Sequence, residues 1–447
     1  MAAARLALTT VSIAAPVVGA VVATGQERPR KIGFASAAVS LAALIAAVWL
    51  TPAASAVLAV DALAAAPALA FAALVAASFL IAPSADLSGA NCRDLLLCLA
   101  GALTLYCAHN PFLLIAGFAV SALPLLIPRA ARGRRSPLKA SIALGLATLL
   151  LAAGSILLMT ATSGTAAMFA LAAVLLASLI RSGVFPFHSW LFSACERPLP
   201  FVAVLSGQAG AFVIARLALP HFPQTALSTL PYITNLTIAG SLFTVLVALG
   251  EVDPKRTLAL LRASQNGFVI SGLTSGALEG ITGALVHWIV AAVAAGGLIL
   301  VLRCLEARYS DLARQEFDGL AARTPRLAAF FLIFSLALVG LPGTLGFCSA
   351  ELLFHGVLEA HPILGLALPV AAAINAIVLL RLFSRIFWGR NRTHVPPMPD
   401  ALLRERLALT AMTLFLIALG LLPHSLITSR VAPAEKLAAL TQPLRHQ

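Results

Sequence analysis

A succession of apolar runs, each long enough to cross a bilayer, constrains this chain more than any other feature of its sequence. A spanning helix needs about 20 mostly apolar residues. Such runs fall at 5–24, 33–50, 56–82, 94–109, 111–128, 139–161, 167–183, 200–219, 231–250, 257–275, 279–303, 326–346, 362–388 and 405–425. Backbone groups in lipid must be hydrogen-bonded within the protein, which favours helices. The sequence therefore predicts an all-α polytopic membrane protein of about 14 transmembrane helices.

The distribution of charge supports this membrane interpretation. Only 11% of the 447 residues are charged, whereas about 25% is usual in soluble domains. The net charge of +13 comes from short basic loops at 28–31, 129–139, 255–256, 303–326 and 390–406. If every run crosses the bilayer once, all of these loops lie on the same side of the membrane. The positive-inside rule assigns that side to the cytoplasm. We therefore expect a multi-pass protein of the bacterial inner membrane, with both termini non-cytoplasmic and no nucleic-acid partner.

One apolar run is interrupted at Arg181-Ser-Gly-Val-Phe-Pro-Phe-His-Ser-Trp-Leu191. Pro186 removes a backbone donor and ends or bends a helix, and Gly183 tolerates unusual backbone conformations. A broken helix survives in a bilayer only where protein or a hydrated cavity satisfies the freed backbone groups. The stretch predicts a helix break next to a buried, hydrated positive charge.

A second interruption occurs at Gly340-Leu-Pro-Gly-Thr-Leu-Gly346, where Pro342 and Gly343 are the expected break residues. Glu351 follows the break within about two turns. Glycine- and proline-interrupted spans in corresponding halves of a chain are typical of transporters built from repeats. The pattern favours two repeats with an ion route near the midplane.

Polar residues in or beside the runs are the candidate proton pathway, because intramembrane ionisable groups are usually functional. Arg181 is either a fixed charge on a proton route or a cation that reaches the interface. His287 lies well inside its run and has the right chemistry for a relay. His188 is either a proton carrier or structural, and Glu351 is either a relay member or a cap. The complete candidate set is Arg181, His188, Gln208, Lys255, His287, Glu351 and Arg381.

Two of these candidates have simple structural interpretations. Gln208 lies among small residues and is expected to form an interhelical hydrogen bond. Lys255 opens a run on the cytoplasmic side, where its simplest role is topological.

The sequence contains no recognisable catalytic constellation. The six cysteines are scattered without a C-x-x-C pair, which argues against a metal or iron–sulfur site. No phosphate-binding glycine loop is present. We expect no cofactor and no metal, and any enzymatic activity would belong to a larger complex.

Taken together, these motifs resemble the antiporter-like proton-channel subunits of respiratory complex I. Related families are the Mrp antiporters, the membrane hydrogenases and the membrane subunit of DAB-type inorganic carbon transporters. The resemblance covers most of the chain. The matching pieces are Val60-Asp61, Phe185-Pro-Phe-His-Ser-Trp-Leu191, Asp253-Pro-Lys-Arg-Thr-Leu-Ala259 with Ser264-Gln265 and Gly267, His287, Leu341-Pro-Gly-Thr344 with Gly346-Phe347, and Arg381 with Phe387-Trp-Gly389.

The resemblance implies two inverted five-helix repeats with discontinuous helices at the two breaks, and a central row of proton-passing side chains. The implied division is 1–92 for helices one to three, 93–220 for the first repeat with its break near 183–200, 229–390 for the second with its break near 340–347, and 391–447 for the last helix and tail. The implied partners are the lipid bilayer, other membrane subunits, a soluble protein and protons.

The chain also departs from the family pattern. The family's glutamate in the fifth helix falls near Ala119, and the lysine before the first break is Arg181, which keeps the charge but does not release a proton. Ala350 holds the usual place of the glutamate after the second break, with Glu351 one residue later. Further positions with the expected ionisable group missing are Gln208, Ala291 and Ala295.

Three functions remain open from the sequence. The leading hypothesis is a proton-translocating or proton-coupled membrane subunit of a complex, either complex I-like, hence NADH-quinone oxidoreductase, or of DAB-type inorganic carbon uptake. The alternative is a non-conducting scaffold that anchors a soluble partner, because several ionisable positions are lost. A stand-alone transporter of a small anion is the third, with Arg181 as its anion partner.

Overall fold

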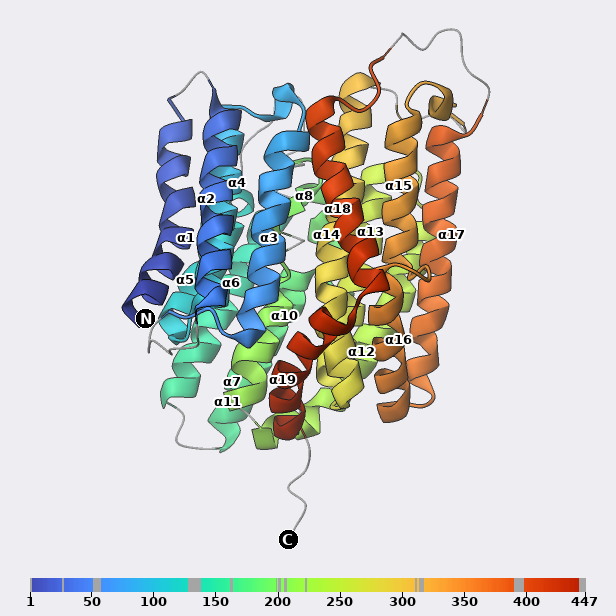
Figure 1. Ribbon diagram of the computed structural model, residues 1–447. Coiled ribbons are helices and arrows are strands. Elements are labelled where there is room, and N and C mark those ends of the chain that lie inside the picture. Colours follow the sequence, from blue (N-terminus) through green and yellow to red (C-terminus); the bar gives the residue numbers. More distant parts are fainter. Residues whose placement is uncertain are drawn as a thin grey trace.

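The computed structural model describes residues 2–25, 28–50, 58–127, 138–160, 164–197, 199, 202–204, 207–221, 223–309, 312, 317–389 and 398–441. Within these ranges the chain is almost entirely helical and contains no strand, apart from an isolated bridge between Leu58 and Ala108. The helices stand side by side as an elongated bundle (Figure 1).

The first half of the chain forms α1 (Ala2–Ala23), α2 (Pro29–Trp49), α3 (Ala62–Ile81), α4 (Gly89–Cys107), α5 (Pro111–Leu126), α6 (Leu138–Thr160), α7 (Gly164–Ser182), α8 (Ser189–Ala194), α10 (Ala209–Val213), η2 (Ile214–Ala218) and α11 (Leu219–His221). The second half forms α12 (Pro223–Gly250), α13 (Pro254–Thr274), α14 (Leu278–Arg308), α15 (Pro325–Leu338), α16 (Leu345–Ala360), α17 (Ala367–Phe387), α18 (Leu403–Leu421) and α19 (His424–Thr441). Short 3₁₀ turns η1 (Ser84–Asp86), η3 (Leu320–Ala322) and η4 (Leu364–Leu366) lie in the connections.

The helices confirm the all-α polytopic fold expected from the apolar runs. Each of the predicted runs contains a helix. Among the described residues, ten helices are long and apolar enough to cross a membrane, or eleven if α18 and α19, which meet at 78°, form one span. The shorter α5 and α15 are also apolar.

The basic loops gather at one end of the bundle, as the parity of the runs predicts. Arg303 pairs with Asp86 at 2.7 Å, and Lys255 pairs with Glu306 at 3.2 Å. Arg308 pairs with Glu405, also at 2.7 Å, at the same end. The start of α1 and the end of α19 lie at the opposite end (Figure 1). The predicted basic residues at 129–135, 314, 390 and 392 lie outside the described residues.

Both expected helix breaks are present. α7 ends at Ser182, Gly183 adopts a φ of 63°, and the Phe185–Pro186 peptide is cis before α8 begins. α15 ends at Leu338 and α16 starts at Leu345, and the link between them includes Gly340 and Gly343 with φ of 85° and 89°. The run at 326–346 is therefore wrong as a single span, because a left-handed backbone at these glycines cannot continue a helix.

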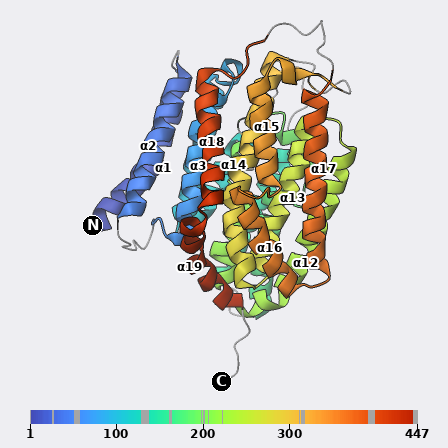
Figure 2. The same cartoon turned by 45° about the vertical axis from the view of Figure 1, so that its right-hand side comes forward.

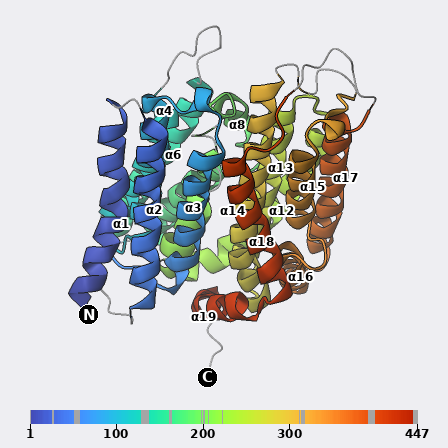
Figure 3. The same cartoon turned by 45° about the horizontal axis from the view of Figure 1, so that its top comes forward.

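α14 is the centre of the second half of the bundle. Its 31 residues make it the longest of the described helices, and its apolar segment is entirely buried. It contacts α13, α15, α16, α3, α18 and α19. α1 and α2 lie on the outer side of α3 (Figure 2), and α19 turns across the lower end of the bundle (Figure 3). Side chains on α14 can therefore meet several helices at once.

Candidate functional site

Arg181 is buried in the protein interior at the first break. Only 3% of the residue is exposed, so the snorkelling alternative is wrong. Its Nη2 donates to Ser121 Oγ at 2.9 Å, and its guanidinium carbon lies 5.3 Å from the centre of the Phe118 ring. Both partners are on α5. The α5 group that faces this cation is therefore a neutral hydroxyl, which leaves the positive charge uncompensated by that helix.

Asn266 connects the first break to α13. Its Nδ2 donates to the carbonyl oxygen of Ser182 at 2.6 Å. Ser182 is the last residue of α7, where a carbonyl loses its intrahelical partner. The asparagine therefore satisfies a backbone group that the break exposes, and it ties α13 to the neighbour of Arg181.

His287 connects α13 to the second break. Its Nε2 lies 2.6 Å from Gln265 Oε1, and its Nδ1 lies 3.0 Å from Ser349 Oγ. Gln265 is the residue before Asn266 on α13, and Ser349 is in the first turns of α16. His287 is the tenth residue of α14, which puts it about 14 Å along that helix from its start. The imidazole is 2% exposed.

The hydrogen bonds of His287 restrict which of its ring nitrogens carry a proton. Ser349 Oγ also lies 2.9 Å from Gly346 O, to which it can only donate. With its single hydrogen used there, Ser349 accepts from Nδ1, while Gln265 Oε1 accepts from Nε2. An imidazole that carries a proton on both nitrogens satisfies all three contacts in this arrangement. A neutral imidazole satisfies them only if the Gln265 amide turns over or the Ser349 hydroxyl rotates. Small side-chain rotations thus accompany a change of protonation.

These hydrogen bonds, together with the chain neighbours Arg181–Ser182 and Gln265–Asn266, form one polar row from break to break. We call it the central row: Arg181, Ser182, Asn266, Gln265, His287 and Ser349. It crosses α7, α13, α14 and α16. Among the described residues of this row, His287 is the single group that exchanges a proton readily, because arginine stays protonated.

Arg262 was not anticipated from the sequence. It is 1% exposed and lies three and four residues before Gln265 and Asn266, so all three share one face of α13. The sequence did carry a signal for it, since an arginine inside the apolar run 257–275 is as unusual as Arg181. The polar partners Ser121 and Ser349 carry no such signal.

His188 and Gln208 lie near the first break without joining the central row. The His188 ring stacks on Phe185 at 5.8 Å and meets the rings of Phe192 and Phe243 near 6 Å. Its buried Nδ1 has no hydrogen-bond partner among the described residues. Gln208 is 3% exposed with a φ of 42°, and neither of its amide atoms has a partner in the described part of the chain. The predicted interhelical hydrogen bond of Gln208 is therefore not formed there.

Three further candidates lie apart from the central row. Lys255 and its ion pair with Glu306 belong to the basic end of the bundle. Arg381 is exposed and donates to the carbonyl oxygen of Leu249, the next-to-last residue of α12. Glu351 is exposed on α16, two residues after Ser349. These positions do not contact the row that links the breaks.

Several buried polar atoms around the central row have no protein partner within the described ranges. They are Nε and Nη1 of Arg181, Oδ1 of Asn266, Oδ1 of Asn375 and both amide atoms of Gln208. Buried polar atoms in native proteins are nearly always satisfied by protein or ordered water. The unpartnered atoms of Arg181, Asn266 and Gln208 lie near the first break and favour water beside that end of the central row. Groups of three or more metal-ligating side chains are not found among the described residues.

Part of the sequence matches a known protein family. Residues 138–375, more than half of the chain, match the family model described as NADH:quinone oxidoreductase/Mrp antiporter, TM. NADH-quinone oxidoreductase subunit M of Rickettsia prowazekii is 26% identical over 260 residues, which cover 57% of this chain and 53% of the relative. The subunit M of Mycobacterium tuberculosis is 26% identical over 252 residues, covering 56% and 46%. The matches thus span about half the length of these relatives.

Solved structures share the fold over nearly the whole chain. A chain of respiratory complex I from Thermus thermophilus superposes with a TM-score of 0.86 at 24% identity, covering 97% of this chain and all of that one. A chain of the Mrp complex from Dietzia sp. superposes with a TM-score of 0.81 at 21% identity, covering 99% of both. At these identities the likeness shows the arrangement of helices.

Proposed function

The chain belongs to the NADH:quinone oxidoreductase/Mrp antiporter transmembrane family, as its motifs predicted, and we propose that it is a proton-translocating membrane subunit of a multi-subunit complex. The observation that carries this proposal is the placement of His287. This buried imidazole is hydrogen-bonded on both nitrogens, between a helix tied to the first break and a helix that starts at the second.

Each part of the central row then has a role. His287 accepts a proton on one ring nitrogen and releases a proton from the other. The side chains of Gln265 and Ser349 stay hydrogen-bonded to the ring and rotate as its protonation changes. Arg181 does not carry protons. Its buried positive charge opposes the arrival of a second cation at the first break, which makes it a gate for the route. Water at the unpartnered polar atoms completes the path between these groups.

The two-repeat organisation is part of the same proposal. We assign 93–220 and 229–390 as inverted repeats, each with its broken helix fourth in order. The breaks then occupy equivalent positions and bracket the central row. His188, Gln208, Lys255, Glu351 and Arg381 remain predicted members of the proton pathway toward the two ends, outside the contacts of the central row.

Proton flux tests the proposal. The complex is purified with its native partners, reconstituted in vesicles and subjected to a pH gradient, and the initial rate of proton movement is recorded with an internal pH dye. We expect His287→Ala to lower this rate by about 100-fold or more, the usual contribution of a general acid or base. His355→Ala is the matched control, because His355 is an exposed histidine of α16 that lies outside the central row. A wild-type rate in assembled His287→Ala complexes refutes the proposal.

A scaffold that anchors a soluble partner without conducting protons is the second candidate. It is favoured by the neutral Ser121 opposite Arg181 and by the exposed position of Glu351, which leave His287 as the one readily titrating side chain in the row. A scaffold predicts that His287→Ala and Arg181→Ala complexes keep full activity, while substitutions in the loop 304–324 release the partner. Loss of activity in the first two variants without loss of assembly excludes it.

The parent complex is either an NADH-quinone oxidoreductase or a DAB-type inorganic carbon transporter. The relationship to subunit M supports the former. Copurification separates them, because quinone and iron–sulfur subunits mark the first assembly and a large zinc-binding soluble protein marks the second. In either complex we assign the chain to the bacterial inner membrane, with both termini non-cytoplasmic.

A further inference from the structure

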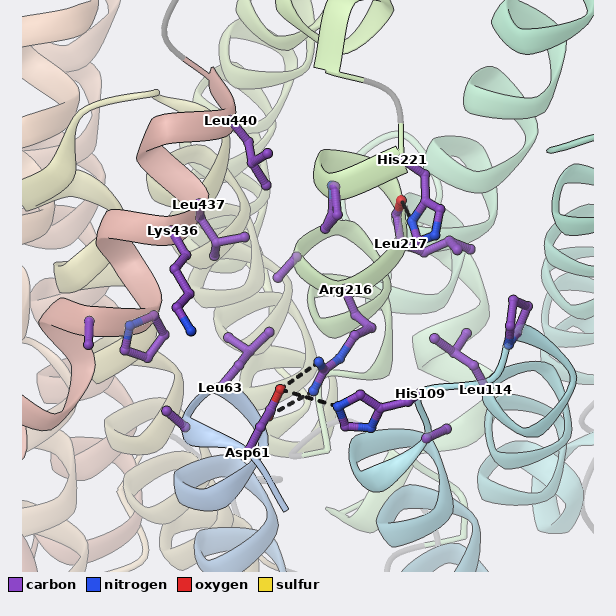
Figure 4. Close-up of a pocket in the computed structure, with 17 residues that line it drawn as sticks. Asp61, Leu63, His109, Leu114, Arg216, Leu217, His221, Lys436, Leu437 and Leu440 are labelled. Atoms are coloured by element: carbon purple, nitrogen blue, oxygen red, sulfur yellow. Dashed lines mark hydrogen bonds and ion pairs between the residues drawn. The ribbon is translucent and has the colours of Figure 1, made fainter. Parts of the chain in front are cut away.

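A cavity of about 350 Å³ lies against α19, and none of the residues that line it belongs to the central row. Figure 4 shows its lining. Its walls come from the start of α3, the turn between α4 and α5, the η2–α11 segment and α19. Arg430 on α19 donates to the carbonyl oxygen of Ala62 at 2.7 Å, which holds α19 against the start of α3. We call this cavity the α19 pocket.

The carboxylate of Asp61, which lines the α19 pocket, forms an ion pair with the guanidinium of Arg216. Both oxygens of Asp61 accept from Arg216, at 2.6 and 2.8 Å, and Oδ1 also accepts from the amide of Ala64 and caps α3. Burial raises the pKa of Asp61, but these bonds, the charge of Arg216 and the nearby His109 together hold the pKa below its usual value of 3.8. Asp61 is therefore ionised at neutral pH, and its charge cancels that of Arg216.

Positive charge remains after this cancellation. Lys436 extends from α19 into the pocket (Figure 4) and makes no ion pair with any described residue. His109 Nδ1 lies 3.2 Å from the carbonyl oxygen of Cys107, and His221 Nδ1 lies 3.1 Å from that of Leu217. A carbonyl can only accept, so in both rings the remaining proton site is Nε2. The pocket thus carries one net positive charge with neutral histidines and more when they are protonated.

The rest of the lining is apolar. Leu63, Leu114, Leu217, Leu437 and Leu440 surround the charged groups (Figure 4). A purely ionic ligand would leave these leucines in water, and a purely apolar one would bury Lys436 without a partner. A ligand that satisfies both parts of the lining has an anionic head and an apolar chain.

We propose that the α19 pocket binds a phospholipid of the bilayer with an anionic headgroup, whose phosphate lies at Lys436 and whose acyl chain contacts the leucines. A lysine ammonium forms charge-assisted hydrogen bonds with phosphate oxygens, which are stronger than hydrogen bonds between neutral groups. Lys436 supplies the main charge for the phosphate, because Arg216 is occupied by Asp61.

Native mass spectrometry of the delipidated, full-length protein in its complex tests this site. The protein is titrated with phosphatidylglycerol, with phosphatidylcholine and with inorganic phosphate as a competitor. We expect phosphatidylglycerol to bind about tenfold more tightly than phosphatidylcholine, because the choline cation of the latter offsets the phosphate charge that Lys436 attracts. Lys436→Gln abolishes this preference, and Lys436→Arg keeps it. Lys31→Gln, at the opposite end of the bundle, leaves it unchanged.

Two outcomes overturn the proposal. Equal affinities for the two lipids, or an unchanged preference in Lys436→Gln, show that the pocket does not recognise the headgroup charge. Displacement of phosphatidylglycerol by millimolar inorganic phosphate shows that the site takes a free oxyanion, which refutes the acyl-chain contact. Lys436→Arg guards against a folding defect, since it preserves both the charge and the length of the side chain.

Discussion

At the scale of single residues, the unusual feature is buried positive charge that no carboxylate neutralises. Arg181 makes one hydrogen bond to a hydroxyl and one contact with an aromatic ring, and two of its nitrogens have no partner in the described chain. Arg308 is also largely buried, but it pairs with the carboxylate of Glu405 at 2.7 Å. The two arginines are a natural pair for separating a structural role from a functional one.

We predict opposite stability changes for these two arginines. Arg181→Met removes a buried charge that no carboxylate on α5 neutralises, so the free energy of unfolding should rise by about 1–4 kcal/mol while proton flux falls. Arg308→Met leaves the carboxylate of Glu405, which is 1% exposed, with only the longer ion pair to Arg404 at 3.9 Å, and should lower stability by about 1–3 kcal/mol. Melting temperatures of the protein in detergent check both signs. A lower melting temperature for Arg181→Met would assign Arg181 to structural support.

The sequence revealed only part of the site at this scale. Arg181 and His287 could be singled out because ionisable groups are costly inside apolar runs. Ser121, Asn266 and Ser349 could not, since such residues are common in transmembrane helices and become partners only when distant helices pack. Gln265 lies in a stretch that matches the family, but the division of Gln265 and Asn266 between the two breaks depends on the rotation of α13.

At the scale of elements, the two breaks organise the molecule. Proline and glycine made both breaks predictable, because neither residue type continues a helix at these conformations. The lengths of α8 and α16 and the bend between α18 and α19 were not predictable. They depend on which helices cover the exposed backbone, and single-sequence patterns carry no such information.

Glycines at the second break should respond very differently to alanine. A Cβ added to Gly343 meets no atom within 4 Å, so Gly343→Ala costs only the strain of its left-handed backbone, about 1–2 kcal/mol. A Cβ added to Gly346 lies 1.8 Å from the carbonyl oxygen of Ala337, so Gly346→Ala forces α15 and α16 apart. We expect folded Gly343→Ala protein with a slightly lower melting temperature, and little or no monodisperse Gly346→Ala protein on size-exclusion chromatography. Equal yields and melting temperatures for the two variants would mean that α15 and α16 can move apart at Gly346 without loss of the fold.

At the scale of the whole molecule, charge asymmetry defines its two ends. The ion pairs of Arg303, Arg308 and Lys255 lie at one end, and the start of α1 and the α19 pocket lie at the other. The sequence predicted this arrangement well because the positive-inside pattern and the count of runs agree. It did not predict the α19 pocket, which joins residues up to about 380 positions apart in the chain.

Reporter fusions test the predicted orientation. Alkaline phosphatase, which is active only outside the cytoplasm, should be active when fused after Thr441 and inactive when fused after Trp388. A fluorescent protein that matures only in the cytoplasm should give the opposite pattern. Phosphatase activity at Trp388 and none at Thr441 would invert the protein and place the α19 pocket on the cytoplasmic side.

The central claim is that His287 changes its protonation within the row that joins the two breaks. Nitrogen-15 magnetic resonance of the imidazole in the reconstituted complex measures this directly, with the His287 signals identified by their loss in His287→Asn. We predict at least two protonation or tautomeric forms over the pH range in which the complex is active, with populations that change with pH. A single, unchanging tautomer across that range would contradict proton transfer through this residue.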